Sequence, residues 1–286
     1  MQYLAPQTMT EAVQALAESK GRVHVLAGGS DLLARMKGGY LEPDVIVDIK
    51  RIKSMSVIKK RAEGFSIGAG VPCIHMGRHS ALKKAWPGVV EAAGLIGSDQ
   101  IQGRCTIVGN LCNASPAADS VPALIAAGAM AVIQGPKGER IINIEKVVKG
   151  PGKTSLKKGE MVERIQLPVK QARSGDAYLR LTPRTEMDIA IVSASVNLTL
   201  DRAGTVTEAR VALGAVAPVA LLVAKAGKAL IGTQLDDEAL ETMAAACRDA
   251  CDPIDDKRGT IDYRTRVAGV LATRAAKLAW QRAGGK

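Results

Sequence analysis

The sequence is poor in aromatic residues and has no long apolar run, and each absence excludes a class of function. Its 286 residues include one Phe, two Trp and four Tyr. A platform of stacked aromatic rings for single-stranded nucleic acid is therefore not expected, and the core must be built from Ala, Val, Leu, Ile and Met. No stretch of about 18 consecutive apolar residues occurs, so we expect no membrane-spanning helix.

Cysteine is also sparse, and its spacing excludes further chemistry. Cys73, Cys105, Cys112, Cys247 and Cys251 form no Cys-x-x-Cys pair, so we expect no iron–sulfur cluster in this chain. We also expect no metal site, because no third ligand accompanies the histidines at positions 75 and 79. An odd number of cysteines, together with a first segment (residues 1–6) unlike a secretory signal, predicts a cytoplasmic protein with reduced thiols.

Positive charge is in excess, with a formal net charge of +11. Lys and Arg are spread along the chain, with short clusters at residues 59–61 and 157–158. A solvated basic surface is the favoured interpretation, and attraction to an acidic partner subunit or an anionic substrate is the alternative. No recognition motif supports nucleic acid as a partner.

Near the N-terminus the sequence predicts a strand, a glycine turn and a helix. A capping box formed by Thr8 and Glu11 opens the first helix. A strand over residues 22–27 then runs into Gly28 and Gly29, and a short helix follows over residues 32–37. Glycine lets the backbone approach a ligand closely, and helix N–H groups favour anions, so this turn is a candidate phosphate site. Paired glycines also make ordinary turns, and the pattern is not a Gly-x-Gly-x-x-Gly motif.

A second polar segment, residues 106–120, reads as an ordered loop rather than a helix or strand. Hydroxyl and amide side chains alternate with small residues, which suits a polar ligand. An apolar stretch over residues 121–130 follows, with Pro122 placed for the first turn of a helix that Asp119 or Ser120 would cap.

The remaining pattern mixes strands and helices. In the first part of the chain we expect a strand at 45–49, a hairpin at 55–58 and 65–68, a helix at 89–95, and strands at 130–133, 140–142 and 160–168. A polar linker at 171–176 is followed by predicted strands at 190–200 and 205–214. Helices are predicted at 218–231, 236–249 and 263–283, with caps near residues 233–236 and at Asp262. The sequence thus predicts an α+β protein.

The two loops together resemble a known family. Residues 27–32, Ala-Gly-Gly-Ser-Asp-Leu, resemble the first pyrophosphate loop of the FAD-binding (medium) subunits of molybdenum hydroxylases, the xanthine dehydrogenase and aerobic carbon monoxide dehydrogenase type. Residues 106–119 resemble the family's second loop, Thr-Ile-Gly-Gly-Asn…Ser-Pro-Ala-Ala-Asp, and the likeness covers nearly the whole chain.

The resemblance implies a fold and a domain division. It implies a two-lobed FAD-binding domain of the vanillyl-alcohol oxidase/p-cresol methylhydroxylase type over residues 1–172, with lobes of about 1–52 and 53–172. A C-terminal α+β domain of the carbon monoxide dehydrogenase flavoprotein type, a small antiparallel sheet with helices, would occupy residues 173–286.

It also implies the residues that hold FAD, and no catalytic residue in this chain. The implied contacts are Leu26, Ala27, Gly28, Gly29, Ser30, Asp31, Leu32, Ile96, Thr106, Gly109, Asn110, Asn113, Ala118, Asp119, Val162, Glu163 and Arg180. Since a carboxylate repels a pyrophosphate, we expect Asp31 to present its N–H while its side chain turns away or caps the helix. Arg180 stands where relatives often carry Lys near the flavin, and it could equally be a surface arginine.

Two departures from the family pattern concern the second loop. Val108 replaces the first of two usual glycines, and its side chain could crowd the pyrophosphate or lean away from it. The usual lead-in, Arg-Asn-Arg-Gly, here reads Gln-Gly-Arg-Cys over residues 102–105.

The resemblance implies an electron-transfer subunit. A large subunit with the molybdopterin cofactor and a small [2Fe–2S] subunit would be its partners, as a dimer of heterotrimers, and FAD would pass electrons to NAD⁺ or another acceptor. A stand-alone FAD-dependent reductase or oxidase is one alternative. A basic nucleic-acid-binding module, recognisable by salt-sensitive binding without flavin, is the other.

Overall fold

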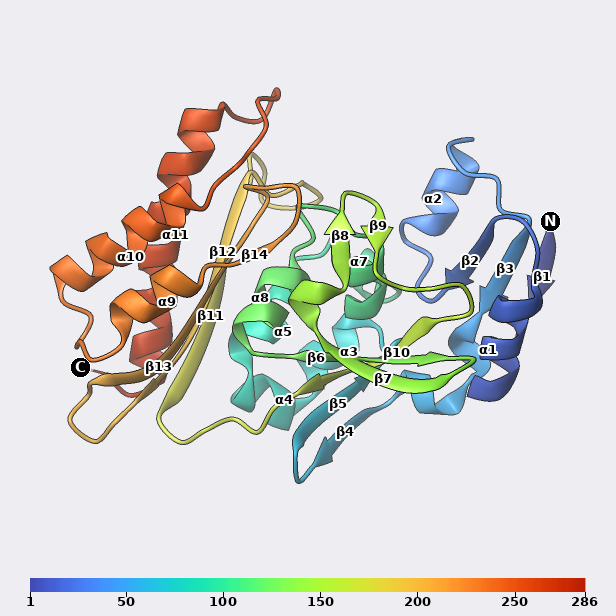
Figure 1. Ribbon diagram of the computed structural model, residues 1–286, viewed down its shortest axis with the longest axis horizontal. Coiled ribbons are helices and arrows are strands. Elements are labelled where there is room, and N and C mark those ends of the chain that lie inside the picture. Colours follow the sequence, from blue (N-terminus) through green and yellow to red (C-terminus); the bar gives the residue numbers. More distant parts are fainter. Residues whose placement is uncertain (286) are drawn as a thin grey trace.

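The computed structural model describes residues 1–285 and shows an α+β protein, as the sequence predicts (Figure 1). Within these residues the strands form sheets of three, five and four strands and one two-stranded hairpin. The three-stranded sheet lies at the N-terminal end of the elongated molecule, and the four-stranded sheet lies at the other end. Within the same residues, no helix combines the length and apolar character that crossing a membrane requires.

The first lobe is a parallel sheet with the strand order β1-β3-β2. Its elements are β1 (Gln2–Leu4), α1 (Met9–Glu18), β2 (Val23–Leu26), α2 (Leu32–Lys37) and β3 (Val45–Asp48). The predicted capping box is confirmed: Thr8 Oγ accepts from the Glu11 N–H at 3.2 Å, and the Glu11 carboxylate accepts from the N–H of Gln7 at 2.8 Å. The predicted strands and the predicted helix over residues 32–37 are confirmed as well.

A five-stranded antiparallel sheet with the order β4-β5-β10-β6-β7 forms the second lobe. Its strands are β4 (Ile58–Arg61), β5 (Gly64–Gly68), β6 (Met130–Gly135), β7 (Gly138–Asn143) and β10 (Met161–Leu167). Six short helices connect β5 to β6: α3 (Cys73–Arg78), α4 (Ser80–Ala85), α5 (Pro87–Gly94), α6 (Asp99–Gln102), α7 (Ile107–Cys112) and α8 (Ser120–Ala126). The small hairpin of β8 (Val148–Gly150) and β9 (Lys153–Thr154) precedes β10.

The prediction of an unbroken loop over residues 106–120 is wrong, because the segment contains α7 and the first residue of α8. Thr106 is the reason: its Oγ accepts from the Gly109 N–H at 2.9 Å and caps α7. α8 begins at Ser120, and Asp119 occupies its N-cap position but makes no capping hydrogen bond. The helix predicted around Pro122 is α8, which ends at Ala126, before the end of the apolar stretch.

The third sheet has the order β11-β12-β13-β14 and is antiparallel. It consists of β11 (Ser174–Leu181), β12 (Val192–Leu200), β13 (Val206–Gly214) and β14 (Leu221–Leu222), followed by α9 (Ala224–Leu230), α10 (Asp237–Asp249) and α11 (Ile261–Arg282). β12, β13, α10 and α11 confirm the predicted elements, whereas the helix expected at 218–231 is only α9.

Two further predictions in this region are corrected. Residues 171–176 are not simply a linker, because β11 begins at Ser174 and pairs along its whole length with β12. The first residues of β11 are polar, and its partner strand lies about twenty residues further along the chain, so the local sequence pattern does not reveal the strand. The cap of α11 is Thr260, whose Oγ accepts from the Tyr263 N–H at 3.2 Å, rather than Asp262.

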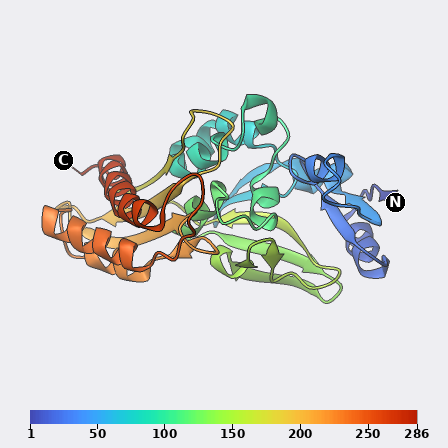
Figure 2. The same cartoon turned by 90° about the horizontal axis from the view of Figure 1, so that it is seen from above.

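The third sheet is covered on both sides, which ties it to the rest of the chain. α11 packs on β11 and β12, while α5 and α8 of the second lobe pack against the same sheet (Figure 2). Arg282 of α11 donates to the Asp176 carbonyl at 2.8 Å and pairs with Glu91 of α5. Arg210 of β13 donates to the carbonyl of Ile125, at the end of α8, at 2.9 Å.

The N-cap of α10 offers a test of the fold. Asp236 Oδ1 accepts from the Ala239 N–H at 2.9 Å, whereas the neighbouring Asp237 is exposed and makes no such bond. We expect Asp236→Ala to lower the free energy of unfolding by about 1 kcal/mol. Asp237→Ala removes the same charge and should cost only about 0.3 kcal/mol. Urea denaturation measures both, and equal losses would contradict the assignment of the cap.

Candidate functional site

A cavity of about 690 Å³ lies where the first lobe meets the second, and both predicted loops line it. Its walls come from the end of α1, from β2 and the turn after it, from residues 105–113, and from residues 152–162. The volume is in the range of about 300–1,000 Å³ that small-molecule and cofactor sites occupy.

The glycine turn after β2 lies directly against the chain that leads into the second loop. A Cβ added to Gly28 would stand 2.0 Å from the Arg104 carbonyl oxygen and 2.9 Å from the Cα of Cys105. Gly29 has a φ of +79°, in the left-handed region that favours glycine. Only a residue without a side chain therefore lets the two loops approach this closely.

The same turn leaves backbone donors available. Within residues 1–285, no protein acceptor binds the N–H groups of residues 29–32, and the first helical bond runs from Leu33 N–H to the Gly29 carbonyl at 3.0 Å. Because backbone N–H groups need acceptors, this turn suits an anionic group of a ligand.

Side-chain amides organise the second loop and join it to the first. Asn110 Oδ1 accepts from the Ser120 hydroxyl at 2.7 Å and from the Ser120 N–H at 3.2 Å, which closes the segment between α7 and α8. Asn113 Nδ2 donates to Asp31 Oδ1 at 3.2 Å, across the cavity edge. The Asp31 side chain makes no capping bond to α2, so capping is excluded for it. That its N–H faces the ligand stays a prediction.

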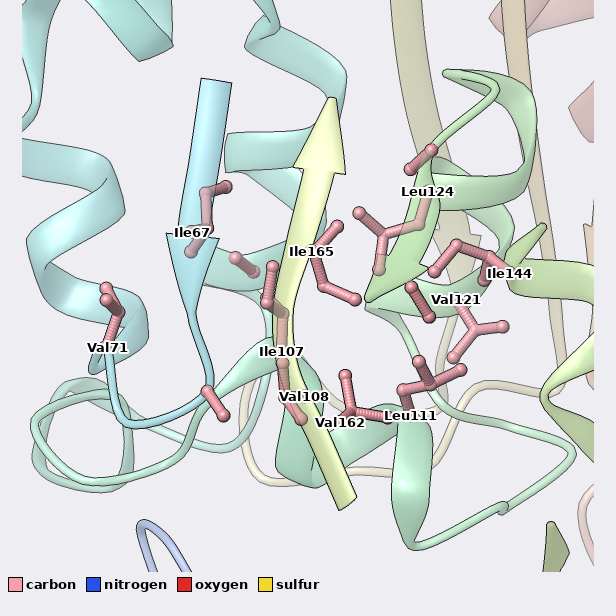
Figure 3. Packing of buried hydrophobic residues seen from close by; sticks show 14 of the residues in the cluster. Ile67, Val71, Ile107, Val108, Leu111, Val121, Leu124, Ile144, Val162 and Ile165 are labelled. Atoms are coloured by element: carbon pink, nitrogen blue, oxygen red, sulfur yellow. The ribbon is translucent and has the colours of Figure 1, made fainter. Parts of the chain in front are cut away.

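Val108 leans into the core and leaves the cavity open. It is 5% exposed and belongs to the same hydrophobic cluster as its helix neighbours Ile107 and Leu111. Figure 3 shows these side chains beside Val162 of β10. Val108 also contributes to the cavity wall, together with Ile96 and Val162, and gives this end of the cavity an apolar lining.

The structure brings most of the predicted site residues to this cavity. The residues that line it are Ala27, Gly28, Gly29, Ser30, Asp31, Leu32, Ile96, Thr106, Gly109, Asn110, Asn113 and Val162. Those that do not line it are Leu26, Ala118, Asp119, Glu163 and Arg180. Glu163 lies on β10 and accepts from Gln134 at 3.1 Å, and Leu26 is buried at the end of β2.

Asp119 and Arg180 form a buried network instead. Asp119 accepts from the Tyr178 hydroxyl at 2.7 Å and from Arg180 Nη1 at 2.8 Å. Burial raises the pKa of Asp119, and Arg180 and Tyr178 oppose that rise. Burial also raises the pKa of Tyr178 well above its usual value. The Arg180 side chain is only 5% exposed, so the alternative of a surface arginine is wrong.

Sequence reasoning missed one wall of the cavity, which consists of residues 152 and 156–161 and carries Lys157 and Lys158. The only signal was the short basic cluster, for which a solvated surface was the favoured interpretation. His24 and Arg35 from the first lobe were missed as well. The pKa of His24 is lowered, first by burial and then by Arg35 and Arg22, so this side chain favours its neutral form.

A cavity of this size between two small lobes, with a glycine turn on one side and amides on the other, defines a dinucleotide-type cofactor site. Comparison with known proteins identifies the cofactor. Residues 1–170 match the model of the FAD binding domain in molybdopterin dehydrogenase, and residues 177–279 match the CO dehydrogenase flavoprotein C-terminal domain. The chain therefore belongs to the family of FAD-binding subunits of molybdenum hydroxylases, as the resemblance implied, and is an oxidoreductase subunit.

Relatives match over nearly their full length. The carbon monoxide dehydrogenase medium chain of Hydrogenophaga pseudoflava is 32% identical, over 98% of this chain and 97% of the relative. The xanthine dehydrogenase FAD-binding subunit of Escherichia coli O157:H7 is 26% identical, over 99% of this chain and 97% of the relative. A chain in the structure of reconstituted CO dehydrogenase from Oligotropha carboxidovorans superposes with a TM-score of 0.95 at 32% identity, over 99% of this chain and 98% of that chain.

The residues present fit FAD. The glycine turn is a cradle that a Cβ would fill, its N–H groups lack protein acceptors, and the apolar wall with Ile96 and Val162 suits a flat ring system. Within residues 1–285, no group of three or more His, Cys, Asp or Glu side chains could hold a metal ion.

Gly28 is the sharpest test of this geometry. We expect Gly28→Ala to push the two loops apart, because the new Cβ meets backbone rather than a flexible side chain. The free energy of unfolding should fall by about 1–3 kcal/mol, and the flavin content of the purified protein should fall with it. Thermal unfolding and flavin absorbance measure the two effects.

Gly77→Ala is the matched control, since nothing lies within 4 Å of the added Cβ on the exposed α3 position. It should leave flavin content unchanged and raise stability by up to about 1 kcal/mol. A Gly28→Ala protein with full flavin and unchanged stability would contradict the close approach of the loops.

Proposed function

We propose that this chain is the subunit through which electrons leave a multisubunit molybdenum hydroxylase. Electrons from the [2Fe–2S] clusters of a partner subunit would reach FAD here and pass to NAD⁺ or another acceptor. FAD supplies the two-electron and one-electron chemistry, and the chain supplies binding, orientation and electrostatics.

The observation that carries the proposal is the contact of Gly28 with residues 104–105, because it places both loops of the family on one cavity. Within residues 1–285, the cavity offers hydrogen-bonding loops and an apolar wall but no cluster of metal ligands. A role in binding a redox cofactor, with substrate chemistry on another chain, agrees with this lining.

We further propose how the chain divides and assembles. The FAD-binding domain comprises residues 1–172, with lobes of about 1–52 and 53–172, and the C-terminal domain comprises residues 173–286. The relatives are named as medium chains or FAD subunits, which supports a large molybdopterin subunit and a small [2Fe–2S] subunit as partners. A dimer of heterotrimers in the cytoplasm is part of the same proposal.

The predicted site residues that line the cavity hold FAD in this proposal. The backbone of residues 28–32 meets the pyrophosphate, Asn110 and Asn113 face polar oxygens, and Ile96 and Val162 border the ring. Asp119 and Arg180 do not line the cavity and support its wall indirectly, because their mutual contact fixes the start of α8. Leu26 and Glu163 adjoin Ala27 and Val162, which line the cavity, and Ala118 precedes Asp119.

Dependence on partner subunits tests the proposed function. We expect the chain co-purified with its partners to release FAD on denaturation, and the flavin in the native complex to be reduced when a substrate of the complex is added. Carbon monoxide, xanthine and glyceraldehyde, the compounds in the names of the relatives, are the first trial substrates. The chain alone, loaded with FAD, should not respond to them. A complex that releases no FAD when it is denatured would refute the cofactor assignment, and turnover by the chain alone would favour a stand-alone flavoenzyme.

Cys112 reports where FAD sits. It lines the cavity, and burial raises its pKa to about 12, while Cys251 lies away from the cavity and has a pKa of about 11. At pH 9 roughly 0.1% of Cys112 and roughly 1% of Cys251 is thiolate, so both should alkylate slowly and faster at higher pH.

We expect FAD to slow the alkylation of Cys112 at least tenfold in the full chain, because it covers the cavity wall, and to leave Cys251 unaffected. Mass spectrometry of iodoacetamide-treated protein, with and without FAD, measures both sites. Equal rates at Cys112 in the two samples would place FAD elsewhere.

A further inference from the structure

The cavity carries an excess of cations that the family motifs do not account for. Lys157 and Lys158 line it from the segment before β10, and Arg35 lines it from α2. Within residues 1–285, none of the three forms an ion pair with a protein carboxylate. All three are exposed, so their charges remain solvated at the edge of the cavity in the absence of a ligand.

The carboxylates of the cavity do not cancel this charge. Glu160 is bound by Arg140 through Nε at 2.9 Å and Nη2 at 2.7 Å. Asp31 is the other carboxylate in the lining, and its partners are the Asn113 amide and the Ser30 hydroxyl. Once Glu160 is paired with Arg140, three cations face one carboxylate, and the balance matches a ligand with two negative charges.

The backbone that carries the two lysines is fixed. The Lys157 N–H donates to Glu160 Oε2 at 2.7 Å, and the Glu160 N–H returns to the Lys157 carbonyl at 2.9 Å. Gly159, with a φ of +83°, packs against Pro136 of the second lobe and Ala17 of α1. This turn therefore contacts both lobes and fixes the backbone from which the two exposed lysine side chains extend at the edge of the cavity.

We infer that Lys157 and Lys158 form a cationic wall that binds the pyrophosphate of FAD across the cavity from the glycine turn. The inference rests on the proposed function, because it assigns these side chains to the same cofactor. The glycine turn offers neutral N–H donors and the nearby carboxylate of Asp31 is repulsive, so the two ammonium groups supply charge compensation that the recognised loops lack. Arg35 adds to the same field from α2.

The test is FAD affinity in the full chain with its partner subunits, after removal and titration of FAD. We expect the double variant Lys157→Gln/Lys158→Gln to bind FAD roughly tenfold more weakly, the effect of two solvated charges on a dianion. Its affinity should also depend less on salt than that of the wild type. Riboflavin, which has no phosphate, should bind both proteins equally. Quenching of flavin fluorescence measures each case.

Matched variants separate the possible outcomes. Lys59→Gln/Lys60→Gln removes the same charge from exposed positions of β4 outside the cavity and should leave FAD affinity unchanged. Lys157→Arg/Lys158→Arg keeps the charge and should bind as the wild type does, whereas equal riboflavin binding controls for misfolding of the Gln variant. If the wild type binds FAD and the Gln double variant binds equally well, the cationic wall is refuted. If the wild type itself does not bind FAD, the proposed function fails first.

Discussion

The contact between the glycine turn and the segment before α7 is the constraint on which the site depends. Gly28 stands against the Arg104 carbonyl at a distance that no side chain permits. This single approach closes the first lobe onto the second and gives the cavity two polar walls from segments about eighty residues apart. The Asn113–Asp31 hydrogen bond joins the same two segments, so the approach is held by a direct bond as well as by packing.

The second lobe acts as the rigid support for this contact. α7 begins at a Thr106 cap and turns Ile107, Val108 and Leu111 into the core (Figure 3). Because close-packed interiors resist small displacements, the polar groups of α7 that face the cavity are fixed by apolar groups on its other side. Val108, the departure from the family's glycine pair, is thus accommodated by the core, beside a cavity of about 690 Å³.

Features of this structure that depend on neighbouring residues can be predicted from the sequence, whereas features that depend on residues far apart in the chain cannot. The capping box at Thr8, the turn at Gly28 and Gly29, and the strands around residues 130–142 are local patterns, and they are predicted correctly. β11 cannot be recognised from the local sequence, because its first residues are polar and are held in a strand only by pairing with β12. α7 is hidden because a six-residue helix has too short an apolar period to detect. The lysine wall is likewise invisible, since a pair of lysines has the same pattern on a cavity as on an open surface.

The network around Asp119 connects the C-terminal domain to the end of the second loop. A buried carboxylate needs partners to offset its loss of hydration. Here both partners, Tyr178 and Arg180, come from β11 of the third sheet. The N-terminus of α8, and with it the end of the second loop, is therefore set by a strand that the FAD-binding domain does not contain. Since α11, α5 and α8 all pack against that strand, a displacement of the third sheet would act on Asp119 and through it on the loop that borders the cavity.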